Sequence, residues 1–286
     1  MVLESLLNPF QLKKRPWDLF IVGMIYTAVA LFLSYFVFRD GAGLLMVFLI
    51  VLATVPTLYT IIKNEEEIDL IYNKEIFMLK EHTKVILFLL SLFMGITFAL
   101  VLSYILLPSN VVDSVFALQQ NAIANVIQTV NNDLVLTGDI TKISLFGNIF
   151  INNIKVLFFC LVFSFLYGTG AMFILTWNAS VIAAAMGTLI KNELGSMAHL
   201  VGLPYLSAYF SAATFSFFRY MTHGVIEIAA YFISGLAGGI ISIALIKHNL
   251  KEDKVLVDAL DLVLISLGFL LVAAFVEVYI TPIIFS

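Results

Sequence analysis

Residues 222–239, with the sequence THGVIEIAAYFISGLAGG, place a histidine and a glutamate one helical turn apart inside an otherwise apolar stretch. A charged group at membrane depth costs roughly 2.5–3.5 kcal/mol on insertion scales, so it normally faces a partner or a water-filled cavity. The stretch therefore predicts a membrane helix that turns His223 and Glu227 toward the protein. We expect this pair to be the best guide to function.

The composition of the whole chain supports a membrane protein. Of its 286 residues, 62% are apolar and only 12% are charged, and the mean hydropathy is +1.05. These values lie outside the range of soluble domains. Apolar runs of about 20 residues recur, whereas an outer-membrane barrel would show alternating segments of about ten. We therefore predict an all-α polytopic transmembrane helical bundle in the lipid bilayer. Without a basic stripe interleaved with aromatic residues, we do not expect the protein to bind nucleic acid.

Run length and flanking polarity predict seven spanning helices. They cover residues 17–38, 43–62, 85–107, 151–176, 203–218, 224–246 and 260–280. Between the fourth and the fifth, residues 178–190 are apolar but short for a crossing, so we expect a half-helix or re-entrant segment there. Packing into the bundle wall is its favoured role, and a substrate-facing broken helix of the transporter type is the alternative.

The chain divides into three parts. Residues 1–62 predict an N-terminal two-helix transmembrane hairpin, and residues 85–286 predict a five-span core with an external loop at 108–145. Between them, residues 63–84 predict a cytoplasmic amphipathic helix that lies on the membrane surface or on a neighbouring helix. A docking surface for a cytosolic partner is the alternative there. The external loop is rich in Asn and Gln, and its apolar spacing predicts a folded hairpin rather than disorder.

The distribution of Lys and Arg predicts the orientation. Eleven of the fifteen fall on one predicted side, namely Lys13, Lys14, Arg15, Lys63, Lys74, Lys80, Lys84, Lys191, Lys247, Lys251 and Lys254. We expect that side, with the N-terminus, to be cytoplasmic, and the C-terminus to be external, in the cell membrane. The first span is too long for a signal-peptide core and lacks a small-residue cleavage site after it, so we expect it to be retained.

Depth along the helices predicts one polar cluster in the outer half of the bundle. Its members are Asn152, Asn153, Lys155, Arg219, His223, Glu227 and Glu277. With about 1.5 Å of rise per residue, Glu227 lies about 6 Å deeper than His223, which we place with Arg219 at an external turn. Glu277 comes to a similar level on the last span. We expect Lys155 and Arg219 to balance the two glutamates.

The favoured role of this cluster is structural, since polar side chains bonded between membrane helices fix their register for about 0.6–2 kcal/mol each. A ligand or partner contact and proton- or ion-coupled transport are the alternatives. A metal site is not predicted, because His223 and Glu227 supply two ligands and no third strong ligand is evident. The single cysteine, Cys160, lies within a predicted span and is expected to be a small core residue.

Enzymatic motifs are missing from the sequence. It contains no H-E-x-x-H, no nucleophile elbow and no Walker A loop, so we predict a protein without enzymatic activity and without a cofactor. Small residues instead mark close helix packing, at Gly168, Gly170, Gly235 and Gly239. Such steps permit close crossing within one chain or between two chains, so a homo-oligomer stays open.

Several of these features occur together in one known family. They are the string FGNIFINNIK at 146–155, then Gly168, Gly170 and Asn178, then His223-Gly224 with Glu227 and Ala229, the glycine-rich stretch to Gly239, and AAFVEVYITP at 273–282. Their order and spacing resemble the stage II sporulation protein M family over roughly Glu81 to Pro282. His82, Gly95, Pro108, Phe116 and Gln119 fall where archaeal-type members tend to carry such residues.

The resemblance implies a five-span core with a cytoplasmic start and an external end. The family is best known for a membrane scaffold that recruits cell-wall-degrading enzymes during engulfment in spore-forming bacteria. A non-enzymatic scaffold or assembly factor with membrane or cell-envelope protein partners is therefore expected. A small-molecule or ion-coupled transporter using the His/Glu cluster is the alternative. The chain departs from the family in its extra N-terminal hairpin and in Ala230, where the family often has proline.

Overall fold

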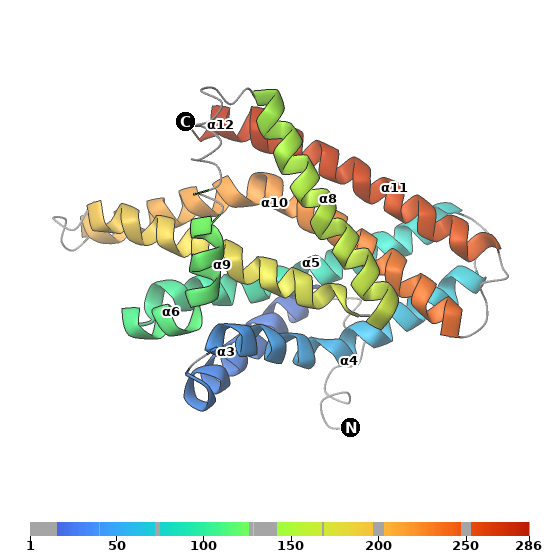
Figure 1. The fold of residues 1–286 in the computed structure, drawn as a ribbon, viewed down its shortest axis with the longest axis horizontal. Coiled ribbons are helices and arrows are strands. Elements are labelled where there is room, and N and C mark those ends of the chain that lie inside the picture. The colour runs from blue at the N-terminus through green and yellow to red at the C-terminus, as the bar shows by residue number, and fades with distance from the viewer. Residues whose placement is uncertain are drawn as a thin grey trace.

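The computed structural model describes residues 16–39, 41–71, 75–125, 128, 142–167, 169–196, 203–246 and 253–285. Within these ranges the regular structure is helical and no strand occurs, which confirms the predicted all-α bundle (Figure 1). The helices cross at varied angles, and α10 runs through the middle of the assembly.

The helices are α3 (Pro16–Val37), α4 (Ala42–Ile71), α5 (Glu75–Leu106), α6 (Ser109–Val115), α8 (Lys142–Tyr167), α9 (Ala171–Ser196), α10 (Leu203–Ile246), α11 (Asp253–Phe275), the π-turn η2 (Val276–Ile280) and α12 (Thr281–Ile284). Six described stretches are long and apolar enough to cross a membrane, and the apolar part of α4, Ala42–Pro56, is a shorter one. The tight link between α3 and α4 uses Gly41, whose φ of 87° suits glycine.

The fourth predicted span and the predicted half-helix have different boundaries in the structure. The chain breaks after Tyr167, and α9 then runs unbroken for 26 residues through the stretch expected to be a half-helix. A Cβ on Gly170 would collide with the carbonyl of Phe163, so the turn requires glycine there. Thr176 had suggested a helix end, but it is buried inside the bundle. Residues 171–195 are thus long enough for a full crossing.

The fifth and sixth predicted spans are one helix. α10 is 44 residues long, and the polar run at 219–223 does not interrupt it. The hydroxyl of Thr222 donates to the carbonyl of Phe218 within the helix, so it needs no turn or solvent. At 1.5 Å per residue α10 is about 66 Å long, roughly twice the hydrocarbon thickness. Only part of α10 can therefore lie in the hydrocarbon.

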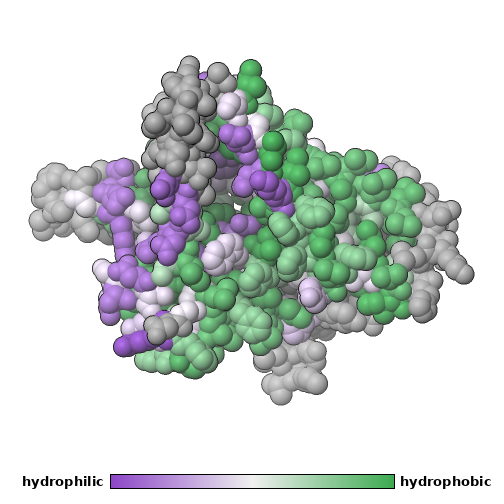
Figure 2. Space-filling model, in the orientation of Figure 1, coloured by the Kyte–Doolittle hydropathy of each residue, from purple (hydrophilic) through white to green (hydrophobic). Residues whose placement is uncertain are grey.

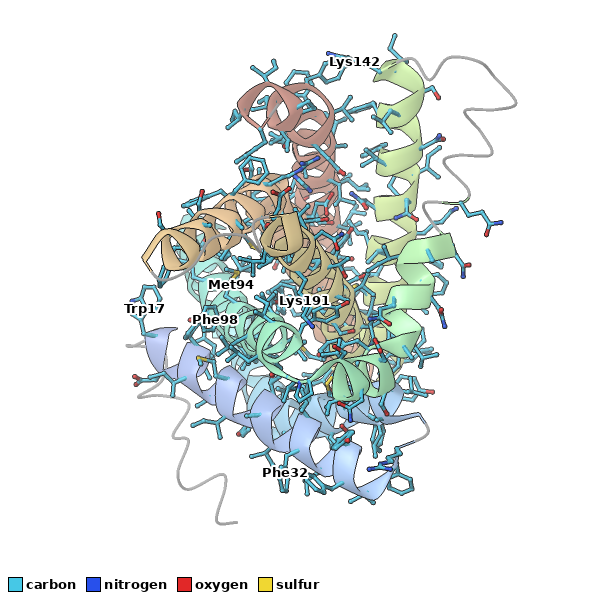
Figure 3. The ribbon with its side chains drawn as sticks, turned by 90° about the vertical axis from the view of Figure 1, so that its left-hand side faces the viewer. Trp17, Phe32, Met94, Phe98, Lys142 and Lys191 are labelled. Carbon is cyan, nitrogen blue, oxygen red and sulfur yellow. The ribbon has the colours of Figure 1, made fainter. Side chains whose placement is uncertain are left out.

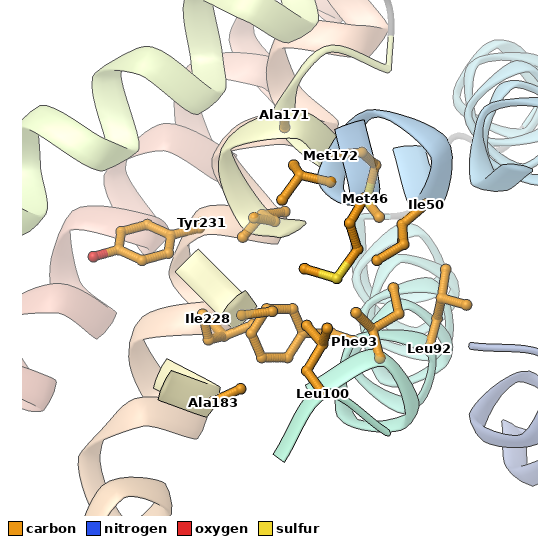
Figure 4. Packing of buried hydrophobic residues seen from close by; sticks show 14 of the residues in the cluster. Met46, Ile50, Leu92, Phe93, Leu100, Ala171, Met172, Ala183, Ile228 and Tyr231 are labelled. Carbon is orange, nitrogen blue, oxygen red and sulfur yellow. The ribbon is translucent and has the colours of Figure 1, made fainter. Parts of the chain in front are cut away.

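The main core lies where α4, α5, α9 and α10 meet (Figure 4). Met46 and Ile50 of α4 pack there with Phe93 of α5, Met172 of α9 and Ile228 of α10. A second cluster joins α10 to α11. In the most apolar 18 residues of α10, 89% are buried, against 22% for α8. α10 is therefore the central helix, and α8 lies at the periphery.

The surface separates by polarity. Figure 2 shows hydrophilic residues gathered around a recess over the region of α6, α9 and the first half of α8, and a hydrophobic surface toward the opposite end. Many large apolar side chains are exposed on α3, α8 and α11, for example Phe32, Phe158 and Leu264. In a bilayer these side chains face lipid, so leaving them uncovered by protein does not expose them to water.

The described helix ends fall into two groups. The end of α4, the start of α5, the end of α10 and the start of α11 lie on one side of the molecule, at the right in Figure 1. These ends flank the two lysine-rich connections at 63–84 and 247–254. Lys191 instead lies near the end of α9, at the opposite side. Because α9 is a full-length helix, Lys191 lies on the opposite side from these four helix ends.

Candidate functional site

A polar cluster joins three elements that are far apart in the sequence. The amide Nδ2 of Asn153, on α8, donates a short hydrogen bond to Oε1 of Glu227, on α10. One turn earlier on α10, Nε2 of His223 lies 4.0 Å from Oε1 of Glu277, on the π-turn. On its other side, Nδ1 of His223 lies 3.5 Å from the hydroxyl of Thr281. The cluster thus connects α8, α10 and the end of the α11 segment.

The π-turn places Glu277 and Thr281 against α10. The backbone N–H of Thr281 bonds to the carbonyl of Val276, five residues earlier, and its hydroxyl donates to the same oxygen at 3.1 Å. Pro282 follows, and it lacks the N–H that an α-helix would require while its ring crowds the carbonyl four residues back. Such π-turns are frequent at functional sites. Sequence reasoning missed Thr281, whose only signal was its place before Pro282.

The two glutamates differ in their surroundings. Glu227 is half-buried, whereas its donor Asn153 and Tyr231, one turn further along α10, are both buried. The side chain of Glu277 is 32% exposed and that of His223 is 14% exposed. The most buried part of the cluster is therefore Asn153, and Glu277 and His223 are partly exposed.

Three members of the expected cluster lie apart from these contacts. Asn152, Lys155 and Arg219 have exposed side chains. The amide of Asn153 donates a hydrogen bond to Glu227. A neutral donor, and not the expected charge of Lys155, therefore pairs with Glu227. The external turn that was to carry Arg219 does not form, because α10 is continuous there. Within the described chain, the direct contacts therefore unite Asn153, His223, Glu227, Glu277 and Thr281.

The glycines expected to pack helices lie in two places. A Cβ on Gly235 would come within 2.8 Å of the Cβ of Ala171, and one on Gly238 would collide with the carbonyl of Leu161. Gly239 is buried, Gly170 forms the turn before α9, and Gly168 lies outside the described residues. Beside them, the hydroxyl of Ser234 donates to the carbonyl of Leu157 on α8. Small residues thus let α8 approach α10 closely, next to the polar cluster.

A second polar network fastens the segment after α6 to α9. Nε2 of Gln119 donates to the hydroxyl of Ser180 at 3.0 Å. Nε2 of Gln120 donates to the hydroxyl of Tyr104, which lies 2.8 Å from that of Thr188. Gln119 and Tyr104 are both buried. Only Gln119 had a sequence signal, through the family resemblance.

The described helices also form an apolar groove of about 830 Å³. It is lined by residues of α3, α5, α9 and α10, and it includes no member of the polar cluster. Among the described residues no group of three or more His, Cys, Asp or Glu side chains could hold a metal ion.

Comparison with known proteins fits this picture. The family model for stage II sporulation protein M matches residues 84–282, a range that includes the whole polar cluster. The chain belongs to the stage II sporulation protein M family. It is also 32% identical over 159 residues to an uncharacterized protein of the archaeon Methanocaldococcus jannaschii, a match covering 53% of this chain and 79% of that protein. This relative agrees with an archaeal-type member. No solved structure matches the chain.

Proposed function

We propose that this protein is a non-enzymatic membrane scaffold or assembly factor that organises partner proteins at the cytoplasmic membrane. The observation that carries the proposal is the extent of two helices. The apolar part of α4 ends at Pro56, yet the helix continues to Ile71. α5 begins at Glu75, before the apolar stretch that starts at Ile86. These extensions, residues 57–71 and 75–85, are called the arm.

The arm extends well past the apolar layer. Fifteen residues of α4 correspond to about 22 Å and eleven residues of α5 to about 16 Å. Its first half, residues 57–71, carries Lys63 and an acidic run of three glutamates and Asp69, and its second half, residues 75–85, carries two lysines and two glutamates. The charged sequence of this pair of helices differs from the apolar spans, and it is the part of the chain that we propose a protein partner binds. The positive-inside rule predicts that the arm is cytoplasmic, because most Lys and Arg residues are expected on that side.

The polar cluster supports a structural role within such a scaffold. Asn153 satisfies Glu227, and the neighbouring glycines bring α8 against α10. Interhelical hydrogen bonds of this kind fix helix register. The large groove is apolar and separate from the cluster, whereas a transport route would join a polar site to water.

In-cell crosslinking, followed by affinity purification and mass spectrometry, tests the proposal. We expect a stoichiometric partner that is lost when the acidic run is reversed in Glu65→Lys, Glu66→Lys and Glu67→Lys. Reversing Lys247, Lys251 and Lys254 to Glu is the matched control, because it also reverses three charges on the same predicted side. Recovery of the protein alone, or only with further copies of itself, would contradict the proposal. Deleting residues 109–144 tests the external loop in the same way.

Ion-coupled transport is the second candidate function. It is favoured by two carboxylates within candidate spans that contact a histidine and an amide rather than Lys or Arg. Buried ionisable residues of this kind mark ion and proton pathways in many membrane proteins. Flux into proteoliposomes that is abolished by Glu227→Gln and Glu277→Gln, but kept in Lys155→Gln, would establish this function in place of the scaffold.

A further inference from the structure

Glu227 and Glu277 lie close together, and neither contacts Lys or Arg among the described residues. Glu227 comes one turn after His223 on α10, and Oε1 of Glu277 lies 4.0 Å from Nε2 of the same histidine. The charge of Glu277 acts on Glu227, whose donor is the neutral amide of Asn153. If both acids ionised, candidate membrane spans would hold two negative charges side by side. Even a protonated His223 would offset only one of them.

The basic residues of the neighbouring helices leave this pair without a positive partner. The side chains of Lys155 on α8 and Arg219 on α10 are exposed. Figure 3 shows Lys142 at the end of α8 that lies beside the last turns of the α11 segment. Its Nζ lies 5.8 Å from the ring centroid of Tyr279. Asn153 comes eleven residues later, so Lys142 lies about 16 Å from it along the axis of α8.

The hydroxyl of Tyr231, one turn after Glu227, is a further polar group of this site. The side chain is 3% exposed, and Figure 4 shows its hydroxyl pointing away from the other labelled core residues. The hydroxyl has no hydrogen-bond partner among the described residues, although the charges of Glu227 and Glu277 both act on it. The buried thiol of Cys160 on α8 is another titratable group near it. A phenol hydroxyl donates to a carboxylate and accepts from a carboxylic acid, so it suits a site that gains and loses a proton.

The chemistry of the site suits a proton better than a metal ion. Mg²⁺ and Ca²⁺ take six or more oxygen ligands, and the described part of the chain offers no group of three or more His, Cys, Asp or Glu side chains that could hold a metal ion. A proton needs a single carboxyl oxygen. Two carboxylates that share a site repel each other, so a proton on either one relieves the repulsion.

We propose that Glu227 and Glu277 form a proton-binding site, in which the two carboxyl groups share one proton at neutral pH and Tyr231 hydrogen-bonds to them. The proton is exchanged with water at the partly exposed Glu277. Its uptake lowers the negative charge of the pair by one, and its release restores that charge. The proposal goes beyond the scaffold function and does not depend on it. Under the second candidate function it names the proton as the ion, and proton binding is measured without flux, so the two are tested separately.

Infrared difference spectroscopy of the purified full-length protein in detergent tests the proposal. A protonated carboxyl has a carbonyl band that an ionised carboxylate lacks, and an ordinary glutamate is ionised at pH 7. We expect this band at pH 7 and its disappearance when the pH is raised. Because each acid disfavours ionisation of the other, Glu227→Gln and Glu277→Gln should each remove the band at pH 7. Asp261→Asn removes an exposed carboxyl from α11 and should keep it as the matched control.

The parent protein alone decides the first point, since absence of the band at pH 7 overturns the proposal without any variant. Loss of the band in only one of the two Gln variants assigns the proton to that acid and overturns the sharing. Tyr231→Phe should keep the band but shift its frequency, because the carboxyl loses a hydrogen bond. An unchanged frequency overturns the part given to Tyr231.

Thermal unfolding at pH 7 tests a metal ion as the occupant. Sodium chloride and calcium chloride are compared with choline chloride at equal ionic strength, and we expect the same midpoint in all three. Stabilisation by Na⁺ or Ca²⁺ that is seen in the parent protein and lost in Glu277→Gln would assign the site to a metal ion and overturn the proposal.

Discussion

At the scale of single residues, the half-buried acids Glu227 and Glu277 have an amide and a histidine as partners and no Lys or Arg within the described contacts. Asn153 donates to Glu227, and His223 lies between Glu277 and Thr281. In hydrocarbon a carboxylate without a donor costs several kcal/mol, so these partners decide whether the acids can be buried. Asn152, the next residue along the chain, is exposed and takes no part. Of these two adjacent asparagines, only Asn153 is therefore expected to contribute to the stability of the fold.

Replacing Asn153 by Leu is expected to lower the free energy of unfolding by about 1–2 kcal/mol, because Glu227 loses its donor while burial is kept. Asn152→Leu is the matched control and should change it by less than about 0.5 kcal/mol. Thermal unfolding of the purified protein in detergent measures both. Equal destabilisation by the two variants would contradict the assigned hydrogen bond.

Tyr104→Phe should cost about 1 kcal/mol, since Gln120 and Thr188 lose a shared hydroxyl partner. Tyr167→Phe provides the comparison, because Tyr167 is 72% exposed at the end of α8. Proteolysis of the segment between α6 and α8 should also become faster in Tyr104→Phe. Unchanged stability and unchanged proteolysis would show that this network does not fasten the segment.

At the scale of elements, close contact between α8 and α10 positions the polar cluster. Gly238 lies against the backbone of Leu161, and Ser234 bonds to the carbonyl of Leu157. Ser234 and Gly238 lie three and seven residues after Tyr231 on α10, the helix that also carries Glu227. The distance between α8 and α10 therefore also affects the hydrogen bond between Asn153 and Glu227. The π-turn before Pro282 likewise places Glu277, at the end of the α11 segment, against α10.

Gly238→Leu should separate α8 from α10 and lower the free energy of unfolding by about 1–3 kcal/mol. Gly268→Leu on α11 tests the same change where a Cβ would meet nothing within 4 Å. Disulfide crosslinking between Asn153→Cys and Glu227→Cys should also weaken in the Gly238→Leu protein. If crosslinking is retained in full, the glycine does not set the distance between these helices.

At the scale of the whole molecule, the described helix ends separate the lysine-rich connections from the C-terminal segment. Ten of the fifteen basic residues then fall on the side we expect to be cytoplasmic, once Lys191 is moved to the opposite side. The bias is still two to one, so the expected orientation stands as a prediction.

Labelling of single cysteines tests this orientation. The native Cys160 is fully buried and should not react, so no background substitution is required. In intact cells, Ile284→Cys should react with a membrane-impermeant maleimide, whereas Asn249→Cys should react only after permeabilisation. The reverse pattern would invert the topology and place the arm outside.

The sequence by itself determined that the chain is an α-helical membrane bundle of the stage II sporulation protein M family. Apolar runs mark which parts of the chain form membrane helices, and the spacing of His223, Glu227 and Glu277 already suggested one cluster. These features depend on local composition and order along the chain, which tertiary contacts do not alter.

Only the tertiary structure decided the helix boundaries and the partners of the acids. Thr176 and the polar run at 219–223 looked like helix ends, since polar residues usually leave a bilayer. In the structure Thr176 is buried within α9 although its hydroxyl has no hydrogen-bond partner among the described residues, and Thr222 donates to the carbonyl of Phe218 on its own helix. Likewise, Lys155 was the obvious partner for Glu227 by charge, but the helix face that α8 turns inward carries Asn153. Which face points inward depends on packing against α10, and no local pattern in the sequence fixes that rotation.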